Sequence, residues 1–453
     1  METNENKTIL TKIQEGLKQS VTLKIVTITI IVLLLLIPHA MVESLIEERE
    51  SYRNAANTEV KEKWGSEQVL TGPFITIPYK KVFKSKEGEI TYTTQYAHFL
   101  PQKLDISGQI EPEIRSRGIY EVVLYNGKLG VKGHFEKPDF AAWGIDPSLI
   151  QWEDALLSMG ISDLAGIQKK ITIQWNGLPR EISPGLLNHE VATAGVHTAV
   201  SFSEAETYPF SFQLDINGSD GLLATPVGKI TTVNIASSWP DPSFDGRFIP
   251  DQHNISDDGF TASWKVFDLN RNYPQQWQGD SQSLAASAFG LNFLLPVDEY
   301  QKNMRSAKYA VLIIALTFLM FFLVEILNKK RFHPIQYALV GLTITVFYVL
   351  LLSFTEHLGF NTAYFLASVL TIGLIVIYVR AVFSSKRLTI MAGTSLIVIY
   401  FFIYVILQLQ DYSLLVGSVG LFIALGILML LSRKIDWYTM SRSTKKLQPD
   451  TSA

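Results

Sequence analysis

The stretch LNFLLPVDEYQKNMRSAKYAVLIIALTFLMFFLVEILNKKRF, residues 291–332, joins two parts of the chain that differ in pattern. Before it, short segments alternate apolar and polar residues, which is typical of half-buried β-strands. After it, apolar blocks follow one another, each about as long as the 20 residues that a membrane span needs. We therefore predict that a β-rich domain ends here and that a bundle of membrane helices begins here.

The same stretch predicts one unbroken helix. No proline or glycine interrupts residues 297–327, and Pro296 can open a helix in its first turn. Such a helix would be roughly 45 Å long against a hydrocarbon core of about 30 Å, so about ten residues should form a stalk clear of the lipid. As one rod, it could carry a tilt from the outer domain to the inner face. Tyr300, Arg305 and Lys308 are predicted interface anchors, because aromatic rings and long cations favour the headgroup level.

The composition limits the possible classes of protein. A length of 453 residues suggests two or three domains, and a net charge of −3 gives no indication of a nucleic-acid partner. The chain has no cysteine, which excludes disulfides, thiolate metal sites and a cysteine nucleophile. We expect no cofactor.

The first apolar block predicts an uncleaved membrane anchor. Residues 1–20 are polar and lysine-containing, whereas residues 25–42 are almost wholly apolar. A cleaved signal peptide is the alternative, but the apolar core is too long for one and no small-x-small cleavage site precedes Glu43. We therefore expect the N-terminus in the cytoplasm and the chain after Glu43 outside.

Basic residues in the short connections predict the topology. Connections 328–335 and 380–387 contain Lys and Arg, as does the tail 433–453, whereas connections 355–361 and 408–412 contain none. Because positive charge favours the cytoplasmic side, this alternation predicts a multi-pass protein of the bacterial inner membrane with both termini in the cytoplasm.

The predicted fold is a six-span α-helical bundle plus a large β-rich periplasmic domain, α+β and mainly antiparallel, inserted after the first span. One observation opposes this topology, because Lys302, Arg305 and Lys308 would lie outside. Long domains, however, translocate largely regardless of charge. The predicted parts are a cytoplasmic N-terminus at 1–20, spans at 21–42, 308–327, 336–355, 362–383, 388–407 and 412–432, the periplasmic domain at 43–300 and a basic cytoplasmic tail at 433–453.

Local patterns within the β-rich domain predict individual elements. PFSFQLDI (209–216) and GFTASWKVF (259–267) alternate strictly, which favours an antiparallel sheet or sandwich with one exposed face. RGIYEVVLYNGKLGVKGHF (117–135) predicts two strands joined by a hairpin turn at Asn126-Gly127. One helix is predicted around 147–159, with Asp146 as N-cap and Pro147 in the first position.

No motif in the sequence names a reaction. There is no phosphate-binding loop, and NGSDG lacks the first glycine of a nucleophile elbow. His189-Glu190 and His197 could bind a metal only if the chain folded back, since on one strand they would be more than about 25 Å apart; surface histidines are the favoured interpretation, with no metal site. The pairs Glu153-Asp154 and Asp257-Asp258 resemble glycosidase carboxylates, but adjacent side chains point apart, which favours turn and surface roles.

The segment SSWPDPSFDGRFIP (237–250) predicts a rigid loop, because three prolines and a glycine exclude an internal strand. Its aromatic residues Trp239, Phe244 and Phe248 could form either a recognition surface or a small satellite core. Packing is the favoured role, given how often large aromatic side chains are buried.

Three ionisable residues in the predicted spans are candidate functional residues. Glu325 lies near the inner end of the second span, and Glu356 and His357 lie near the outer end of the third. Snorkelling or helix–helix pairing is favoured for each, because each is within about one turn of a predicted end. No charged group lies near the middle of a predicted span, which argues against an ion-coupled transporter. His333-Pro334 is predicted to begin the third span.

Several stretches together resemble the CreD family of bacterial inner-membrane proteins, which is linked to cell-envelope integrity. The resemblance implies a Gram-negative-type envelope, a β-rich periplasmic domain, expression under a two-component sensor and effects on the response to β-lactams. It implies no catalytic residue. The matching stretches are Trp64-Gly65 with Gln68, GPFITIPY (72–79), RGIYEVVLY (117–125), SSWPDPSFDGRFIP (237–250), PVDEYQKNMRSAKYAVL (296–312), HPIQYALVGL (333–342) and FYVLLLSFTEHLGFNTAY (347–364).

These observations favour a non-enzymatic envelope-maintenance protein, with the lipid bilayer as one partner and an envelope component or a protein as another. An enzyme acting on envelope glycan or lipid is the first alternative, and it predicts carboxylates that converge within about 5–9 Å. A transporter or channel is the second, and it predicts a polar cavity lined by Glu325 or by Glu356 and His357.

Overall fold

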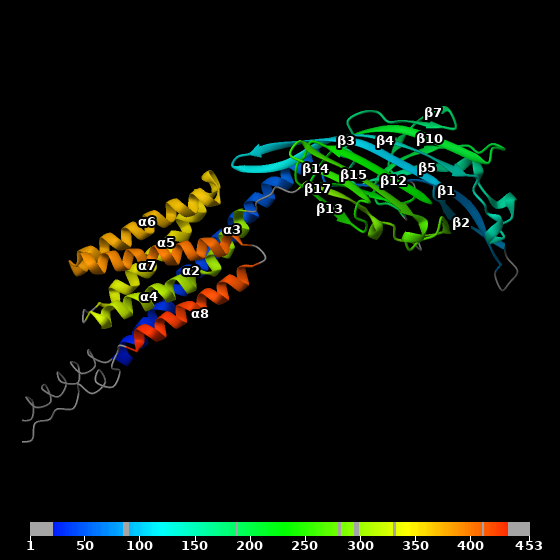
Figure 1. The fold of residues 1–453 in the computed structure, drawn as a ribbon. Helices are drawn as coiled ribbons and strands as arrows, with labels where there is room; N and C mark the ends of the chain where they lie inside the picture. Colours follow the sequence, from blue (N-terminus) through cyan, green and yellow to red (C-terminus); the bar gives the residue numbers. More distant parts are fainter. Residues whose placement is uncertain are drawn as a thin grey trace, which may run out of the picture. The chain divides into compact units, whose positions relative to one another are not determined.

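The computed structural model describes residues 21–84, 90–186, 189, 191–279, 282–293, 299–328, 332–409 and 412–433. The chain divides into two compact units, Arg53–Pro296 and the combination of Met1–Tyr52 with Val297–Ala453. Helix α2 (Val21–Trp64) contributes residues to both units (Figure 1). Several sequence-based expectations lie outside the described residues: the N-terminus 1–20, Glu190, the helix opening at Pro296, the basic cluster 329–331 and the tail beyond residue 433.

One sheet of the β-rich unit has nine strands within the described part of the chain. Strand β1 (Gln68–Lys84) pairs in parallel with β11, and the other pairings in this sheet are antiparallel. Its other strands are β2 (Ile90–Phe99), β5 (Leu156–Ile161), β8 (Ser183–Pro184), β9 (Gly195–Ala199), β11 (Gly221–Thr225), β13 (Pro242–Gly246), β16 (Gln276–Gln278) and β17 (Phe289–Phe293).

The second sheet has eight strands in the same described residues, in the order β14-β15-β12-β3-β4-β10-β6-β7. Strands β12 and β3 are parallel, and the other neighbours are antiparallel. The strands are β3 (Lys103–Arg117), β4 (Tyr120–Glu136), β6 (Thr172–Trp175), β7 (Leu178–Glu181), β10 (Thr207–Ser219), β12 (Ile230–Ser237), β14 (Gln252–Ser256) and β15 (Gly259–Phe267).

Side chains from both sheets form one hydrophobic core. In β10, Tyr208, Phe210, Phe212 and Leu214 are buried, whereas the residues that alternate with them from Pro209 to Gln213 are exposed. In β15, Trp264 has no exposed surface. The alternating strands predicted at 209–216 and 259–267 are therefore confirmed, and so is a large β-rich unit. Because each strand turns one face to the core, the polar side chains of the same strands lie on an outer face.

The predicted hairpin at Asn126-Gly127 is wrong. Strand β4 runs straight through both residues, and Asn126 pairs with Glu111 of β3 and with Asn217 of β10. The turn lies instead at Gly118, whose φ of 64° suits a tight connection. A local turn signal is overridden here because two neighbouring strands hydrogen-bond β4 in its extended form on both sides.

The predicted helix around 147–159 is also wrong, although its N-cap is correct. Asp146 accepts a hydrogen bond from the backbone N–H of Ser148, but only short 3-10 turns follow, Pro147–Leu149 and Trp152–Asp154. The next residues form β5, which is buried between β1 and β9. An apolar run with both faces covered can be a central strand as readily as a helix, and its neighbours decide which.

The segment 237–250 is not wholly a loop. Residues Pro242–Gly246 form β13, an edge strand that pairs with β17. Pro242 stands at its first position, where a missing N–H is tolerated. The prediction that no internal strand occurs here agrees with this edge position.

The helical unit contains five described helices that are long and apolar enough to cross a membrane, or six if a bent pair is one span. Four of the five are sequential helices that follow the bent pair, and the fifth is α2. His333 caps the first of these four, with Pro334 at its start, as predicted. The helices after α2 are α3 (Glu299–Lys308), α4 (Ala310–Leu327), α5 (Pro334–Leu358), α6 (Phe360–Phe383), α7 (Lys386–Gln408) and α8 (Ser413–Ser432).

The predicted unbroken helix is bent by 41° between α3 and α4. At the bend, the Tyr309 N–H donates to the Ser306 carbonyl three residues back, so the hydrogen bonding tightens locally to the 3-10 pattern. Helix α3 is not a free stalk either, because Asn303, Ser306 and Ala307 are buried within the helical unit. The idea of a single rod carrying a tilt therefore loses its structural basis.

Candidate functional site

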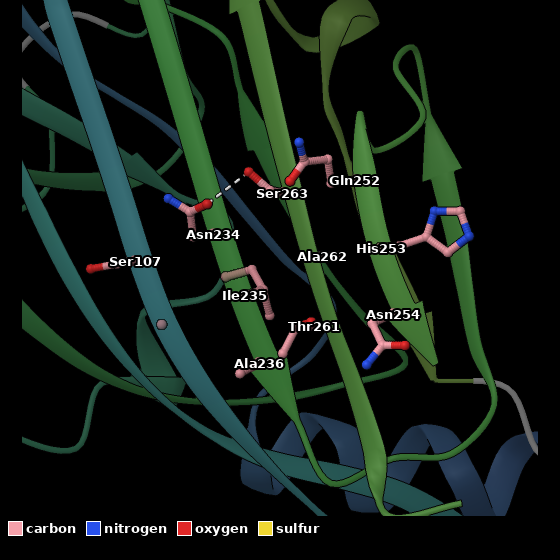
Figure 2. Close-up of a pocket in the computed structure, with 11 residues that line it drawn as sticks. Ser107, Asn234, Ile235, Ala236, Gln252, His253, Asn254, Thr261, Ala262 and Ser263 are labelled. Carbon is pink, nitrogen blue, oxygen red and sulfur yellow. Dashed lines mark hydrogen bonds between the residues drawn. The ribbon is translucent and has the colours of Figure 1, made fainter. Parts of the chain in front are cut away.

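A polar hollow of about 430 Å³ lies on the outer face of the eight-stranded sheet. Figure 2 shows its residues on four neighbouring strands, β3, β12, β15 and β14. The strand register builds it from two rows that cross these strands. The first polar row is Ser107, Asn234, Ser263 and Gln252, and the second polar row is Ala236, Thr261 and Asn254, continued on β3 by Gln109, which lines the adjoining hollow only.

The alternation of β12 and β15 explains why these residues face outward. Val233 and Ile235 of β12 and Trp264 of β15 enter the core, so the residues between them point away from it. Ala236 leaves room in the second polar row because its side chain is small, while the rows supply amides and hydroxyls around it. Ser263 Oγ donates to Asn234 Oδ1 at 2.7 Å, the dashed line in Figure 2.

The chemistry of the hollow is that of a binding surface for neutral polar groups. Amide and hydroxyl side chains both donate and accept hydrogen bonds, as sugar hydroxyls and acetamido groups require. No Asp, Glu, Lys or Arg is among the residues that line it. His253 turns the other way, with its ring 5.5 Å from that of Phe244. An adjoining hollow of about 370 Å³ extends the surface past Asn254 to Asp258.

Sequence reasoning missed these rows. The alternation in GFTASWKVF marks Thr261 and Ser263 as outward-facing, but nothing local indicates that Asn234 or Gln252 lies beside them. The candidate carboxylate pairs do not create a second site here. Asp154 accepts a hydrogen bond from Gln151 within its own turn, at 3.0 Å.

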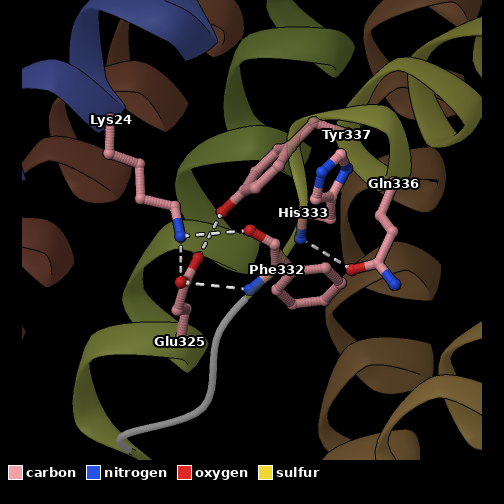
Figure 3. A network of polar contacts seen from close by, with 6 residues as sticks. All are labelled: Lys24, Glu325, Phe332, His333, Gln336 and Tyr337. Atoms are coloured by element: carbon pink, nitrogen blue, oxygen red, sulfur yellow. Dashed lines mark hydrogen bonds and ion pairs between the residues drawn. The ribbon is translucent and has the colours of Figure 1, made fainter. Parts of the chain in front are cut away.

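Glu325 forms a polar cluster in the helical unit (Figure 3). It is 5% exposed and lies near the end of α4. Its carboxylate pairs with Lys24 of α2 and accepts hydrogen bonds from Tyr337 Oη of α5 at 3.1 Å and from the Phe332 N–H at 3.1 Å. Lys24 also donates to the Phe332 carbonyl at 3.3 Å. The cluster thus ties three helices together.

Glu356 lies at the other end of α5. It accepts a hydrogen bond from Tyr300 Oη of α3 at 3.1 Å, and Arg49 Nε of α2 is 4.0 Å away. His357 is exposed beside it. Glu299 accepts the Phe360 N–H at 3.2 Å and so caps α6. These contacts pair helices of the same unit.

The predicted interface anchors differ in their surroundings. Tyr300 is buried, with 8% of its surface exposed, and its hydroxyl donates a hydrogen bond to Glu356. Arg305 donates to the Leu409 carbonyl at 3.0 Å, which holds α3 against the end of α7. Lys308 is exposed at the end of α3.

The aromatic residues of 237–250 pack against the core of the β-rich unit. The ring of Trp239 lies 6.0 Å from Phe293, and that of Phe248 lies 5.7 Å from Phe289. Phe244 lies 5.7 Å from Trp264. All three are partly buried, so each retains some surface.

The histidines singled out as possible metal ligands lie apart from any ligand cluster. His189 Nδ1 is 3.1 Å from the Thr193 carbonyl, and His197 Nδ1 is 2.7 Å from the Gly185 carbonyl. Among the residues that the structure describes, no group of three or more His, Cys, Asp or Glu could hold a metal ion.

Gly65 and Gln68 are buried in the β-rich unit, and Trp64 beside them is partly buried. The Gln68 amide donates to the carbonyls of Asp163 at 3.0 Å and Asn217 at 3.1 Å. Gly65 has a φ of 139°, and a Cβ there would lie 2.7 Å from the Asn217 carbonyl oxygen. Gly65 and Gln68 are therefore required for close packing where the end of α2 leads into β1.

The long apolar helices and the mixed β-sheet unit define a multi-pass membrane protein with a large extramembrane domain. Residues 20–438 match the family model described as Inner membrane protein CreD. The chain is also 31% identical over 417 residues to Inner membrane protein CreD of Escherichia coli (strain K12), across 90% of this chain and 92% of that one. This chain belongs to the CreD family and is a multi-pass protein of the inner membrane.

Solved structures show only weak similarity. An M1 zinc metallopeptidase from Deinococcus radiodurans aligns with 37% of this chain and 38% of its own, at 9% identity and a TM-score of 0.20. A two-domain M1 zinc metallopeptidase bound to L-arginine aligns with 37% of this chain and 39% of its own, at 9% identity and a TM-score of 0.18. At this level, neither bears on the fold or the function of the chain.

Proposed function

We propose that this protein supports the integrity of the cell envelope by binding cell-wall glycan on the outer face of its eight-stranded sheet. In this proposal the β-rich unit lies in the periplasm and the helical unit holds it at the membrane. The proposal keeps the expectation that the protein is expressed under a two-component sensor.

One observation carries the proposal: amide and hydroxyl side chains from two cross-strand rows line a hollow of about 430 Å³. Rigid strands hold these groups in fixed positions, which reduces the entropy lost when a ligand binds. A neutral glycan fits this surface, because its hydroxyl and acetamido groups match donors and acceptors without needing a charge.

The lining favours binding over turnover. Glycoside hydrolysis needs two carboxyl groups about 5–9 Å apart across the scissile bond. The hollow itself is lined by no carboxylate, and the adjoining hollow is lined by one carboxylate, that of Asp258. The transporter alternative predicts that Glu325 or Glu356 lines a polar cavity. The contacts of these two residues are instead with residues of neighbouring helices, which argues against that alternative.

The test is binding of the purified full chain, in detergent, to cell-wall glycan by co-sedimentation with sacculi and by titration with soluble fragments. The double variant Asn234→Ala with Gln252→Ala removes two amides at about 1 kcal/mol each, so binding should fall by roughly 30-fold. Ala236→Trp should abolish binding by filling the hollow, since its side chain points away from the core.

Matched controls lie on the same face of the sheet, outside the hollow. Thr232 of β12 and Lys265 of β15 are paired across the two strands. The variants Thr232→Ala and Lys265→Ala should bind the glycan as the wild type does. Unchanged binding in both hollow variants would contradict the proposal, and so would defined turnover of the glycan by the purified protein.

A further inference from the structure

Helices α4, α7 and α8 line an apolar hollow of about 540 Å³. Leu323 of α4, Met391 and Val398 of α7, and Ile427 of α8 contribute to its walls. This volume falls in the range of roughly 300–1,000 Å³ that small-molecule sites occupy. No residue of α8 between Ser413 and Ser432 is buried, so α8 covers the hollow loosely and leaves it open to lipid.

One end of this hollow carries positive charge. Arg387 lies one helical turn before Met391, so both occupy the same face of α7. Lys386 precedes it at the start of α7, and Arg433 follows the end of α8 two residues after Leu431, which lines the hollow. All three cations are exposed. None forms an ion pair with an acidic side chain among the described residues.

We propose that the helical unit binds an anionic phospholipid here, with an acyl chain in the hollow and the phosphate against Lys386, Arg387 and Arg433. The site is separate from the glycan surface and does not depend on it.

The two halves of the site require this class of ligand together. The walls are apolar apart from the hydroxyls of Thr394 and Ser395, which suit an acyl chain and its ester. A soluble anion would find nothing to bind along these walls, and a zwitterionic lipid would gain less from three cations. The start of α7 adds the partial positive charge of a helix N-terminus at the same end.

The test uses the purified full chain, stripped of lipid in detergent, and native mass spectrometry. Titration with phosphatidylglycerol and with phosphatidylcholine of identical chains should show retention of the anionic lipid at about tenfold lower concentration, since each basic side chain near the headgroup adds attraction. Glycerol phosphate, which has the anion without the chains, should not be retained.

Variants separate the two halves of the site. The triple variant Lys386→Gln, Arg387→Gln, Arg433→Gln should lose the preference for the anionic lipid, because it keeps the hollow and removes the charge. Ala424→Trp should reduce retention of both lipids, because it fills the hollow from α8. Lys308→Gln removes an exposed cation of the same unit from α3 and should leave both affinities unchanged.

Equal retention of the two lipids by the wild type would overturn the proposal. Unchanged preference in the triple variant would also overturn it. Lys386, Arg387 and Arg433 are exposed, so the triple variant should fold, and it tests the proposal even if Ala424→Trp does not fold. Retention of glycerol phosphate alone would replace the lipid site with a soluble-anion site.

Discussion

The carboxylate of Glu325 is buried in the helical unit, with 5% of the residue exposed. A buried charge is costly unless it is paired and hydrogen-bonded, and Glu325 has an ion pair and two hydrogen-bond donors. Its partner Lys24 is 301 residues away in sequence and keeps 27% of its side chain exposed. The pair therefore joins α2 to α4. The Glu325 carboxylate is buried, whereas the Lys24 side chain stays partly exposed.

Breaking this pair should destabilise the helical unit. We expect Glu325→Ala to cost about 3–5 kcal/mol, because Lys24 and Tyr337 lose their shared acceptor. The double variant Lys24→Ala with Glu325→Ala should cost less than the sum of the single variants, since each single variant leaves an unpaired charge and the double variant leaves none. Thermal unfolding of the full chain in detergent measures both effects. Glu48→Ala, at an exposed position of α2, is the control, and a Glu325→Ala variant as stable as this control would refute the pairing.

At the scale of elements, the end of α2 is held by the hairpin of β3 and β4 within the β-rich unit. The guanidinium of Arg115 lies 4.0 Å from the ring of Trp64, and Arg117 bonds the carboxylate of Glu59 at 2.7 Å. The Lys63 hydrogen bond, followed by the charge of Arg117, holds the pKa of Glu59 below its usual value of 4.5. These contacts are largely exposed, so each adds little alone.

We expect Arg115→Ala with Arg117→Ala to loosen residues 53–64 without unfolding the sheets. Amide hydrogen exchange there should speed up on the order of threefold to tenfold, as for the loss of one cation–π contact and one surface pair. Because the pKa of Glu59 is depressed, its contribution is present at neutral pH and is lost as the pH falls below 4.5. The difference in exchange between the variant and the wild type should therefore shrink in acid to the part that the Arg115–Trp64 contact contributes. Lys128→Ala, which removes another exposed pair on β4, should leave exchange in 53–64 unchanged.

At the scale of the whole molecule, we propose that the β-rich unit is periplasmic and that both termini are cytoplasmic. The basic connections alternate with uncharged ones along the chain, which is what this orientation requires. The bent pair of α3 and α4 then counts as the second of six spans.

The absence of cysteine makes this topology directly measurable with single introduced thiols. Ser256→Cys on β14 and His357→Cys at the end of α5 should react with a membrane-impermeant maleimide in intact spheroplasts. Ser384→Cys, between α6 and α7, should react only after the membrane is opened. All three positions are exposed, so a difference in labelling reports the side of the membrane on which the thiol lies and not its burial. Labelling of Ser384→Cys in intact spheroplasts would reverse the orientation.

The sequence alone determined the features that depend on local pattern. Apolar runs of about 20 residues located the long helices, and strict alternation located strands such as 259–267, because hydropathy and period are properties of a single segment. His333-Pro334 was correct as a helix start for the same reason, since a cap involves only its own turn. The family could also be recognised, because its matching stretches extend over most of the chain.

Tertiary structure alone decided every feature that depends on a distant partner. The hairpin signal at Asn126-Gly127 yielded to pairing with β3 and β10, and the expected helix at 147–159 yielded to a place between β1 and β9. The bend at Tyr309 accompanies the packing of α3 in the helical unit. The polar hollow needs four strands in one register, and Glu325 needs a lysine 301 residues away. Such contacts are long-range. The sequence of one segment does not specify which distant segment will pair with its backbone hydrogen-bonding groups or cover its apolar side chains.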